Sequence, residues 1–225
     1  MGWLALTQAF DEAVDRWDGR VGPPSPENRK TASIPVFRNA FVERFLARSH
    51  PILPGVWFGP PIVAGLAIGI HASPAWGLSL FAIGLLAWTL LEYVLHRFVF
   101  HHRPGSARSA KIRQFLMHGY HHEFPNDRMR LVAPPLMSWP IAAAVALGYR
   151  LVLGPIGWWP AFAGTAAGYL AYDWVHYYTH HFVPQWALGK YLRRIHLVHH
   201  HADADKNHGI SSPLWDVVFG TYRAR

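Results

Sequence analysis

The chain has 225 residues, of which 51% are hydrophobic and only 15% are charged. Soluble domains usually carry about 25% charged residues, so this composition favours an integral membrane protein. The absence of cysteine excludes disulfides, thiolate metal sites and cysteine nucleophiles, and any metal must be held by His, Asp or Glu. The net charge of +8 does not predict nucleic-acid binding, because the basic residues are not gathered on one patch.

Residues 1–51 are mixed and polar, and we expect them to form a cytosolic N-terminal segment. Phe37, Phe41 and Phe45 are interspersed with arginines, a pattern that predicts a short amphipathic helix at a membrane surface. A helix packed on the protein's own catalytic face would explain the same pattern. We expect residues 52–225 to form one membrane-embedded domain.

Four apolar runs follow, and each is near the roughly 20 residues that a membrane-spanning helix requires. The joints after the first and third runs, residues 71–75 and 154–157, are too short for anything but tight hairpins. We therefore predict an all-α fold with four transmembrane helices arranged as two hairpins. The runs are residues 52–70, 76–100, 136–153 and 158–178.

Lysine and arginine lie almost entirely on one side of the expected bilayer. They fall before residue 51, within residues 97–130 and after residue 189, and only Arg150 lies elsewhere. The positive-inside rule then places both termini and the central loop in the cytoplasm. The membrane would be the inner membrane of a bacterium, which the Ala-, Arg-, Trp- and Pro-rich composition favours, or the endoplasmic reticulum of a eukaryote.

The fourth apolar run ends in a polar stripe. His176 and His180 are four residues apart and share a helical face with Tyr169, Tyr172 and Asp173. Burying such a stripe is costly unless something binds to it. Satisfied core histidines would explain one such pair, but three further histidine groups have matching geometry.

These further groups lie at the expected cytoplasmic helix ends or just past them. Adjacent helical residues diverge by about 100°, so a His-x-x-His-His group can offer its two adjacent imidazoles to two neighbouring metals. Residues five apart diverge by about 140°, so His96 and His101 should serve different metals or straddle a helix end. The groups are His96 and His101; His118, His121 and His122; and His196, His199 and His200.

The four groups together supply ten imidazoles, enough for five on each of two metal ions. Five ligands would leave one position of an octahedral ion free for dioxygen. Imidazole suits Fe, Zn, Cu or Ni, so the ligand type does not choose among them. Glu92 and Asp173 lie inside apolar helices, where carboxylates are candidates for function. Each could orient a ligand by accepting a hydrogen bond from its free ring nitrogen, or could make a polar contact between helices.

The histidine groups and the residues between them resemble the integral-membrane fatty acid hydroxylase superfamily. The narrower resemblance is to the fatty acid 2-hydroxylases that act on sphingolipid acyl chains. It covers about residues 90–221. The matching stretches are residues 92–101, 118–127, 130–135, 173–181 and 209–221.

This resemblance implies a cytosolic helical cap over the membrane helices, enclosing a dinuclear metal centre with all ten histidines as ligands. It implies iron in the working enzyme, although zinc can occupy such sites. His208 stands where the family pattern has an aromatic residue, and it stays unassigned. Eukaryotic relatives often carry a fused cytochrome domain, which about 50 N-terminal residues cannot hold. A separate electron donor, a cytochrome or ferredoxin with its reductase, is therefore expected.

The expected reaction inserts one atom of dioxygen into an unactivated C–H bond of a lipid acyl chain. The resemblance places it at carbon 2 of a fatty acyl group of a sphingolipid or related lipid. Tyr169, Tyr172 and Asp173 are the candidates for holding the polar end of that lipid. The alternatives are a carotenoid- or sterol-type hydroxylase or desaturase, a bacterial aminolipid hydroxylase, and a metal-binding membrane protein without redox chemistry.

Overall fold

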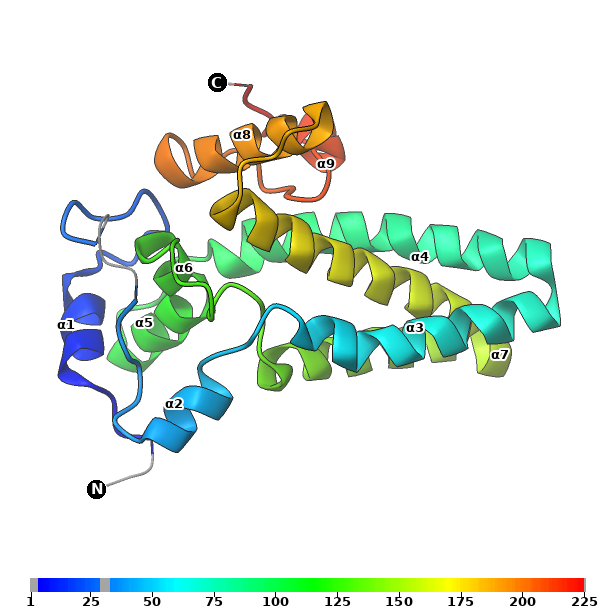
Figure 1. Ribbon diagram of the computed structural model, residues 1–225, viewed down its shortest axis with the longest axis horizontal. Helices are drawn as coiled ribbons and strands as arrows, with labels where there is room; N and C mark the ends of the chain where they lie inside the picture. The colour runs from blue at the N-terminus through cyan, green and yellow to red at the C-terminus, as the bar shows by residue number, and fades with distance from the viewer. Residues whose placement is uncertain (1–3, 29–32, 225) are drawn as a thin grey trace.

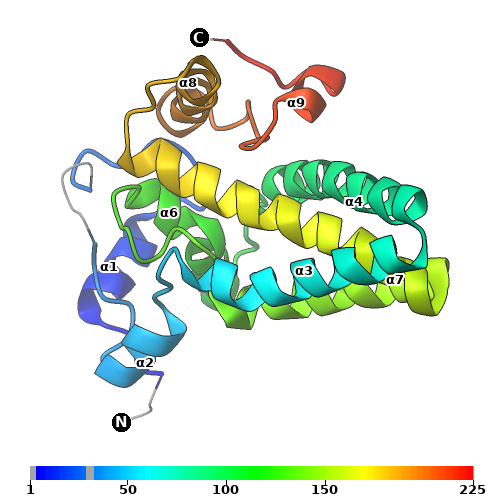
Figure 2. The same cartoon turned by 45° about the vertical axis from the view of Figure 1, so that its right-hand side comes forward.

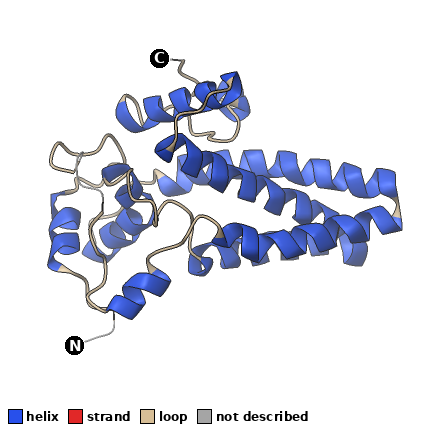
Figure 3. Ribbon diagram, in the orientation of Figure 1, coloured by secondary structure: helices blue, strands red, loops and turns tan. Residues whose placement is uncertain are grey.

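The computed structural model of the protein describes residues 4–28 and 33–224. These residues form helices joined by loops, with no β-strand among them (Figure 3). In chain order the elements are α1 (Gln8–Arg16), α2 (Ala40–Leu46), α3 (Leu53–Ala72), α4 (Pro74–Val94), η1 (Leu95–Phe100), α5 (Arg108–Gln114), η2 (Phe115–Gly119), α6 (Tyr120–Glu123), α7 (Pro135–His181), α8 (Ala187–His201) and α9 (Leu214–Val218).

Three elements of the described chain are long and apolar enough to cross a membrane. They are α3, α4 with its continuation η1, and the 47-residue α7. Figure 1 shows them side by side along the longest axis, with α1, α5 and α6 gathered at the end opposite the α3–α4 turn. The all-α fold is therefore confirmed, with three candidate membrane-spanning helices among the described residues. The third and fourth apolar runs of the sequence fall within one element, α7.

The long α7 is interrupted at Gly154, where φ is 74° and ψ is −170°. Glycine adopts such a positive φ without the steric cost that a Cβ imposes, and Pro155 directly after it cannot continue the preceding hydrogen-bond ladder. Figure 2 shows the two limbs of α7 folding back along each other. The hydroxyls of Tyr149 and Thr165 lie 2.9 Å apart and link the limbs. The chain thus turns at the joint that the sequence indicated.

Glycines allow α4 and the second limb of α7 to approach each other closely. A Cβ on Gly84 would collide with the carbonyl oxygen of Ala161, and one on Gly164 would collide with that of Phe81. Membrane helices associate mainly through such close packing, because lipid offers no hydrophobic drive between them. This close contact holds the second limb of α7, which carries the polar stripe, in a fixed position against α4.

The N-terminal segment packs on the histidine-bearing helices instead of extending away from them. Phe10 and Trp17 lie against Phe115 of η2, with ring centroids 5.6 and 5.3 Å apart. Phe10 and Phe115 are fully buried, and Tyr120 of α6 belongs to the same core. The segment therefore forms one wall of the region that holds the histidines.

The short helix expected among residues 37–48 is present as α2. Its first turn is capped by Asn39, whose side-chain oxygen accepts from the backbone N–H groups of Phe41 and Val42. Val42 is buried against the protein, whereas Phe41 and Phe45 are 60% and 58% exposed. The helix thus packs on the protein with one face and leaves an aromatic face uncovered.

Candidate metal centre

The ten histidines singled out in the sequence lie together in two groups of five. Within each group one ring nitrogen per residue lies within 4.8 Å of all the others. Group A comes from η1, its end, η2, α6 and α8, and group B comes from α6, α7 and α8. Group A is His96, His101, His118, His122 and His199, and group B is His121, His176, His180, His196 and His200.

A π-helix explains why His96 and His101 belong to the same group. In η1 the backbone N–H of His101 donates to the carbonyl oxygen of His96 at 3.2 Å, a bond that spans five residues. A π-turn therefore returns to the same face after five residues, whereas an α-helix does so after about 3.6. The expectation that the pair might serve different metals is wrong. The alternative, that the pair lies at a helix end, is what the structure shows.

Both His-x-x-His-His groups divide their adjacent imidazoles as their spacing predicted. On α6, His121 joins group B while His122 joins group A. On α8, His199 joins group A while its neighbour His200 joins group B. The two groups are therefore interleaved, because α6 and α8 each contribute histidines to both groups.

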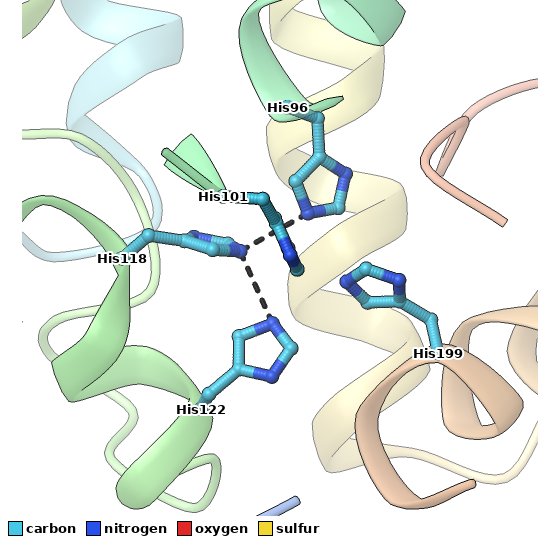
Figure 4. Close-up of side chains that lie close together, drawn as sticks. All are labelled: His96, His101, His118, His122 and His199. Atoms are coloured by element: carbon cyan, nitrogen blue, oxygen red, sulfur yellow. Dashed lines mark hydrogen bonds between the residues drawn. The ribbon is translucent and has the colours of Figure 1, made fainter. Parts of the chain in front are cut away.

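The spacing of the imidazole nitrogens fits a shared metal ion. In group A the Nε2 atom of His118 lies 3.0 Å from that of His96 and 3.1 Å from that of His122 (Figure 4). In group B the Nε2 atom of His121 lies 3.0 Å from those of His176 and His200. Two nitrogens bound at right angles to one ion, at about 2.1 Å each, would lie about 3.0 Å apart.

Backbone carbonyls fix the orientation of three imidazoles in group A. The Nδ1 atoms of His96, His122 and His199 donate to the carbonyl oxygens of His208, Gly22 and Lys206 at 2.5, 3.1 and 2.7 Å. Each bond requires a proton on Nδ1 and leaves the Nε2 lone pair free for a metal.

The Nε2 atoms of His101 and His199 are buried without a hydrogen-bond partner among the described residues. Burial, with a smaller contribution from neighbouring histidines, lowers the pKa of His121 and His199 to about 3. Burial also moves the pKa of His118 and His122 well below the ordinary value. These imidazoles are therefore neutral near pH 7, as metal ligands must be.

The carboxylates at this end of the helices do not contact the ligand candidates as expected. Glu92 accepts hydrogen bonds from the backbone N–H groups of Ile210 and Ser211 and from the Ser211 hydroxyl. It makes the polar contact with another segment that was the alternative interpretation. Asp173 is buried, and its Oδ2 atom has no hydrogen-bond partner among the described residues.

An apolar cavity of about 490 Å³ connects the histidines with the membrane helices. His118 of group A and His121 and His176 of group B line one part of it. From there the lining follows α7 through the polar stripe to Thr165 and, on the first limb, to Val145. Tyr169, Tyr172 and Asp173 therefore lie along the cavity between the histidines and its membrane end.

Sequence reasoning left one buried histidine next to group A without a role. The ring of His208 lies 5.6, 5.3 and 5.5 Å from those of His96, His101 and His199, and its residue is 2% exposed. Its backbone carbonyl, and not its ring, makes the hydrogen bond with His96. No spacing rule indicates such a backbone contact. His102, His181 and His201 stay outside both groups.

A sequence model described as fatty acid hydroxylase matches residues 81–221 and so includes all ten histidines. The chain belongs to the fatty acid hydroxylase family. Family membership confirms that it is an oxidoreductase of the kind that the histidine pattern predicted. Two groups of histidines that could each hold a metal ion, beside an apolar cavity, suit such an enzyme.

Several members of this family with assigned activities are similar to the chain. The dihydroceramide fatty acyl 2-hydroxylase FAH2 of Arabidopsis thaliana is 40% identical over 189 residues, which cover 75% of this chain and 71% of that protein. The ceramide very long chain fatty acid hydroxylase SCS7 of Saccharomyces cerevisiae is 35% identical, over 88% of this chain and 51% of its own length. The human fatty acid 2-hydroxylase is 40% identical, over 63% and 39%.

A solved structure of full-length Scs7p, in which only the hydroxylase domain is visible, has the same fold. It superposes with a TM-score of 0.82 and 31% sequence identity, over 94% of this chain and 82% of that one. This agreement extends beyond the family match to include most of the N-terminal segment. The packing of that segment on the histidine-bearing helices thus belongs to a fold seen in a relative.

Proposed function

We propose that the chain is a two-metal membrane oxygenase that hydroxylates carbon 2 of a fatty acyl group in a sphingolipid or related lipid. The observation that carries the proposal is the apolar cavity that leads from between the membrane helices to both histidine groups. Such a cavity suits a substrate that enters from lipid and reacts near its polar end. The named activities of the similar plant, yeast and human proteins support the same reaction.

Group A would hold one metal ion and group B the other, with all ten histidines as ligands. Iron is the proposed metal, and zinc is a possible occupant of the same nitrogen ligands. The chemistry that a bound iron pair supplies is activation of dioxygen for insertion of one oxygen atom into a C–H bond. The second oxygen atom leaves as water, which requires two electrons and two protons.

The protein's own side chains would position the lipid and exclude water. Tyr169, Tyr172 and Asp173 line the cavity beside the histidines, where their polar atoms can hydrogen-bond an amide or ester. The hydroxyl of Tyr169 is buried beside the Asp173 carboxyl group, so the two side chains together would offer a donor and an acceptor to such a group. An acyl carbonyl held there would place the first carbons of its chain next to both groups.

The proposed topology has four membrane crossings, because α7 turns back at Gly154. Both termini would face the cytoplasm, with residues 1–51 as a cytosolic segment and residues 52–225 as the membrane-embedded domain under a helical cap. The exposed rings of Phe41 and Phe45 on α2 would rest at the membrane surface. The electrons would come from a separate cytochrome- or ferredoxin-type donor with its reductase.

Lipid analysis of cells with and without the chain tests the activity. The expected result is a new lipid species heavier by one oxygen atom, with the label incorporated when cells grow under ¹⁸O₂. Fragmentation should place the hydroxyl at carbon 2 of the acyl group. A hydroxyl in mid-chain, on a ring or on a head group would contradict the proposal and favour another branch of the family.

A further inference from the structure

A loop after α8 reaches two ligands of group A through its backbone. The carbonyl of Lys206 accepts from His199, and the carbonyl of His208 accepts from His96. Between these carbonyls lies Asn207, which has a positive φ of 56°. Its side chain donates to the carbonyl oxygen of Ile195 and accepts from the backbone N–H of Arg223. The loop is thus tied to α8 and to the C-terminal segment.

Two buried carboxylates hold the next part of this loop. Glu92 is 4% exposed and accepts from the backbone N–H groups of Ile210 at 2.5 Å and Ser211 at 2.8 Å. Asp216 is fully buried and accepts from the backbone N–H groups of His208 at 2.8 Å and Gly209 at 2.7 Å. Four consecutive backbone N–H groups are therefore bound to carboxylates.

The geometry of this loop leaves little room for adjustment. A Cβ on Gly209 would collide with the carbonyl oxygen of Ser212 and lie 3.0 Å from Asp216. Asp216 is anchored in turn by the hydroxyl of Thr221, which donates to it at 2.7 Å. Glu92 on α4 lies one turn before His96 of η1, which continues that helix, so one continuous helix supplies a candidate ligand and a carboxylate that binds the loop carrying its acceptor.

We infer that Glu92 and Asp216 are positioning residues for the metal of group A, acting through the loop carbonyls and not as ligands. This inference rests on the proposed ligand role of the histidines. Hydrogen bonds to the second ring nitrogen set the tautomer and direction of a ligating imidazole, and losing such a partner typically costs about 10–100-fold in metal affinity. In group B, by contrast, no described carboxylate-held loop contacts the imidazoles.

The substitution Glu92→Gln tests this role because it keeps the size of the side chain. The charge is lost, and the oxygen that accepts from the Ser211 hydroxyl can be replaced by an NH₂ group. The remaining neutral oxygen then binds the backbone N–H groups of Ile210 and Ser211 more weakly than a carboxylate does. The purified holoprotein is titrated with a chelator, and bound metal per chain is counted by mass spectrometry. The expected result is that one of two ions leaves at a chelator concentration about 10–100-fold lower than in the wild type. Asp216→Asn should act in the same direction.

Glu43→Gln is a matched control for general loss of stability. Glu43 is also buried and also accepts from two backbone N–H groups, those of Val36 and Phe37 at 3.0 and 3.1 Å. It contacts neither histidine group. This variant should unfold at a lower temperature and still hold both ions at the wild-type chelator concentration.

Combination with a ligand variant assigns the lost ion to one group. His180→Ala disrupts group B, and adding Glu92→Gln should then leave almost no metal. His101→Ala disrupts group A, and adding Glu92→Gln should then cause no further loss. If Glu92→Gln released its metal at the same chelator concentration as the wild type, the inference would be wrong but the proposed metal centre would stand. The same conclusion would follow if Glu92→Gln caused an equal additional loss of metal in the His180→Ala and His101→Ala backgrounds. A wild-type chain without metal would refute the proposed centre and the inference together.

Discussion

His121 and His199 each lie in the group opposite to that of the adjacent histidine. Removing either imidazole therefore weakens one group and leaves the other complete. For His121→Ala and His199→Ala we expect bound metal to fall from two ions per chain to about one, and product formation to be lost. Metal analysis of the purified variants checks the bound ions, and lipid product assays check the loss of activity. His102→Ala, next to a ligand but exposed and outside both groups, should keep both ions. Two ions and normal turnover in both ligand variants would refute the ligand assignment.

Burial of His121 and His199 also makes the metal-free protein sensitive to acid. Their pKa of about 3 in the folded chain lies below the unfolded value of about 6.5. The unfolded chain therefore binds more protons below pH 6.5, and folding loses stability as the pH falls, by about 1.4 kcal/mol per pH unit for each group.

Thermal unfolding of metal-stripped protein in detergent should thus occur at a lower temperature at pH 5.5 than at pH 7.5. Replacing both histidines with Gln should make this dependence shallower. A midpoint that is unchanged or higher at pH 5.5 would contradict the expectation.

Variants in the polar stripe on α7 test the proposed lipid positioning separately from metal binding. Tyr172→Phe removes a hydroxyl from the cavity wall, and Asp173→Asn removes the charge and replaces one acceptor oxygen with an NH₂ group, while both leave all ten histidines in place. We expect turnover to fall by about 10-fold or more, since an unmet substrate hydrogen bond in a buried site is costly. Metal content should stay close to that of the wild type. Loss of metal in step with activity would show that these residues support the centre instead.

At this scale the sequence predicted the imidazoles but not what orients them. All ten histidines lie in the two groups, because i to i+4 spacing on a helix is a local property. The acceptors of His96, His122 and His199 are backbone carbonyls from other segments. Their identity depends on the path of loops in space, which residue spacing does not encode. Of the two interpretations of Glu92, orientation of a ligand's ring nitrogen does not hold, because its partners Ile210 and Ser211 also come from a distant loop.

Among the elements, the π-helices η1 and η2 are the features that an α-helical reading misses. The angle of about 140° for residues five apart holds only for 3.6 residues per turn. In η1 one wider turn brings His96 and His101 to the same face, and η2 carries His118. The joint at Gly154 was predictable, because Gly-Pro is a local signal that ends a helix.

The two limbs of α7 also bound the membrane end of the cavity. Val145 on the first limb lines it, and about 16 Å of helix separates Thr165 on the second limb from His176. Val145→Trp should therefore fill the far end and shorten the acceptable acyl chain, lowering kcat/KM for the longest substrates by about tenfold or more.

Competition between long and short acyl substrates measures this shift. Val152→Trp is the control, because Val152 is on the same limb but 81% exposed and outside the cavity. An unchanged preference in Val145→Trp would show that the chain does not extend to this end.

For the whole molecule, the distribution of Lys and Arg makes a topological prediction. A reporter fused after Arg225 should be active only on the cytoplasmic side, and so should one placed in the loop before α5. A reporter at the α3–α4 turn should give the opposite result. Activity of the C-terminal fusion on the outer side alone would refute the orientation.

Long-range assembly was less predictable than membrane insertion. Hydropathy identified the apolar runs, because a bilayer selects for length and composition. The sequence did not indicate that Trp17 packs on Phe115 or that Gly22 accepts from His122. Residues about 100 positions apart make these contacts, and no periodic pattern connects them. The described N-terminal residues, through Trp17 and Gly22, therefore contribute directly to the candidate centre.

The histidines and the Ser73 turn between α3 and α4 lie at opposite ends of the long helices (Figure 1). In the proposed reaction, the metal ions, the electrons and the dioxygen would all be used at the histidine end, so a single compartment would have to supply the metal and the electrons. A membrane-impermeant chelator or reductant added to the other side of a sealed vesicle would have no target there. Vesicles whose histidine end faces outward and vesicles whose histidine end faces inward would thus behave as two separate populations in any assay of metal binding or turnover.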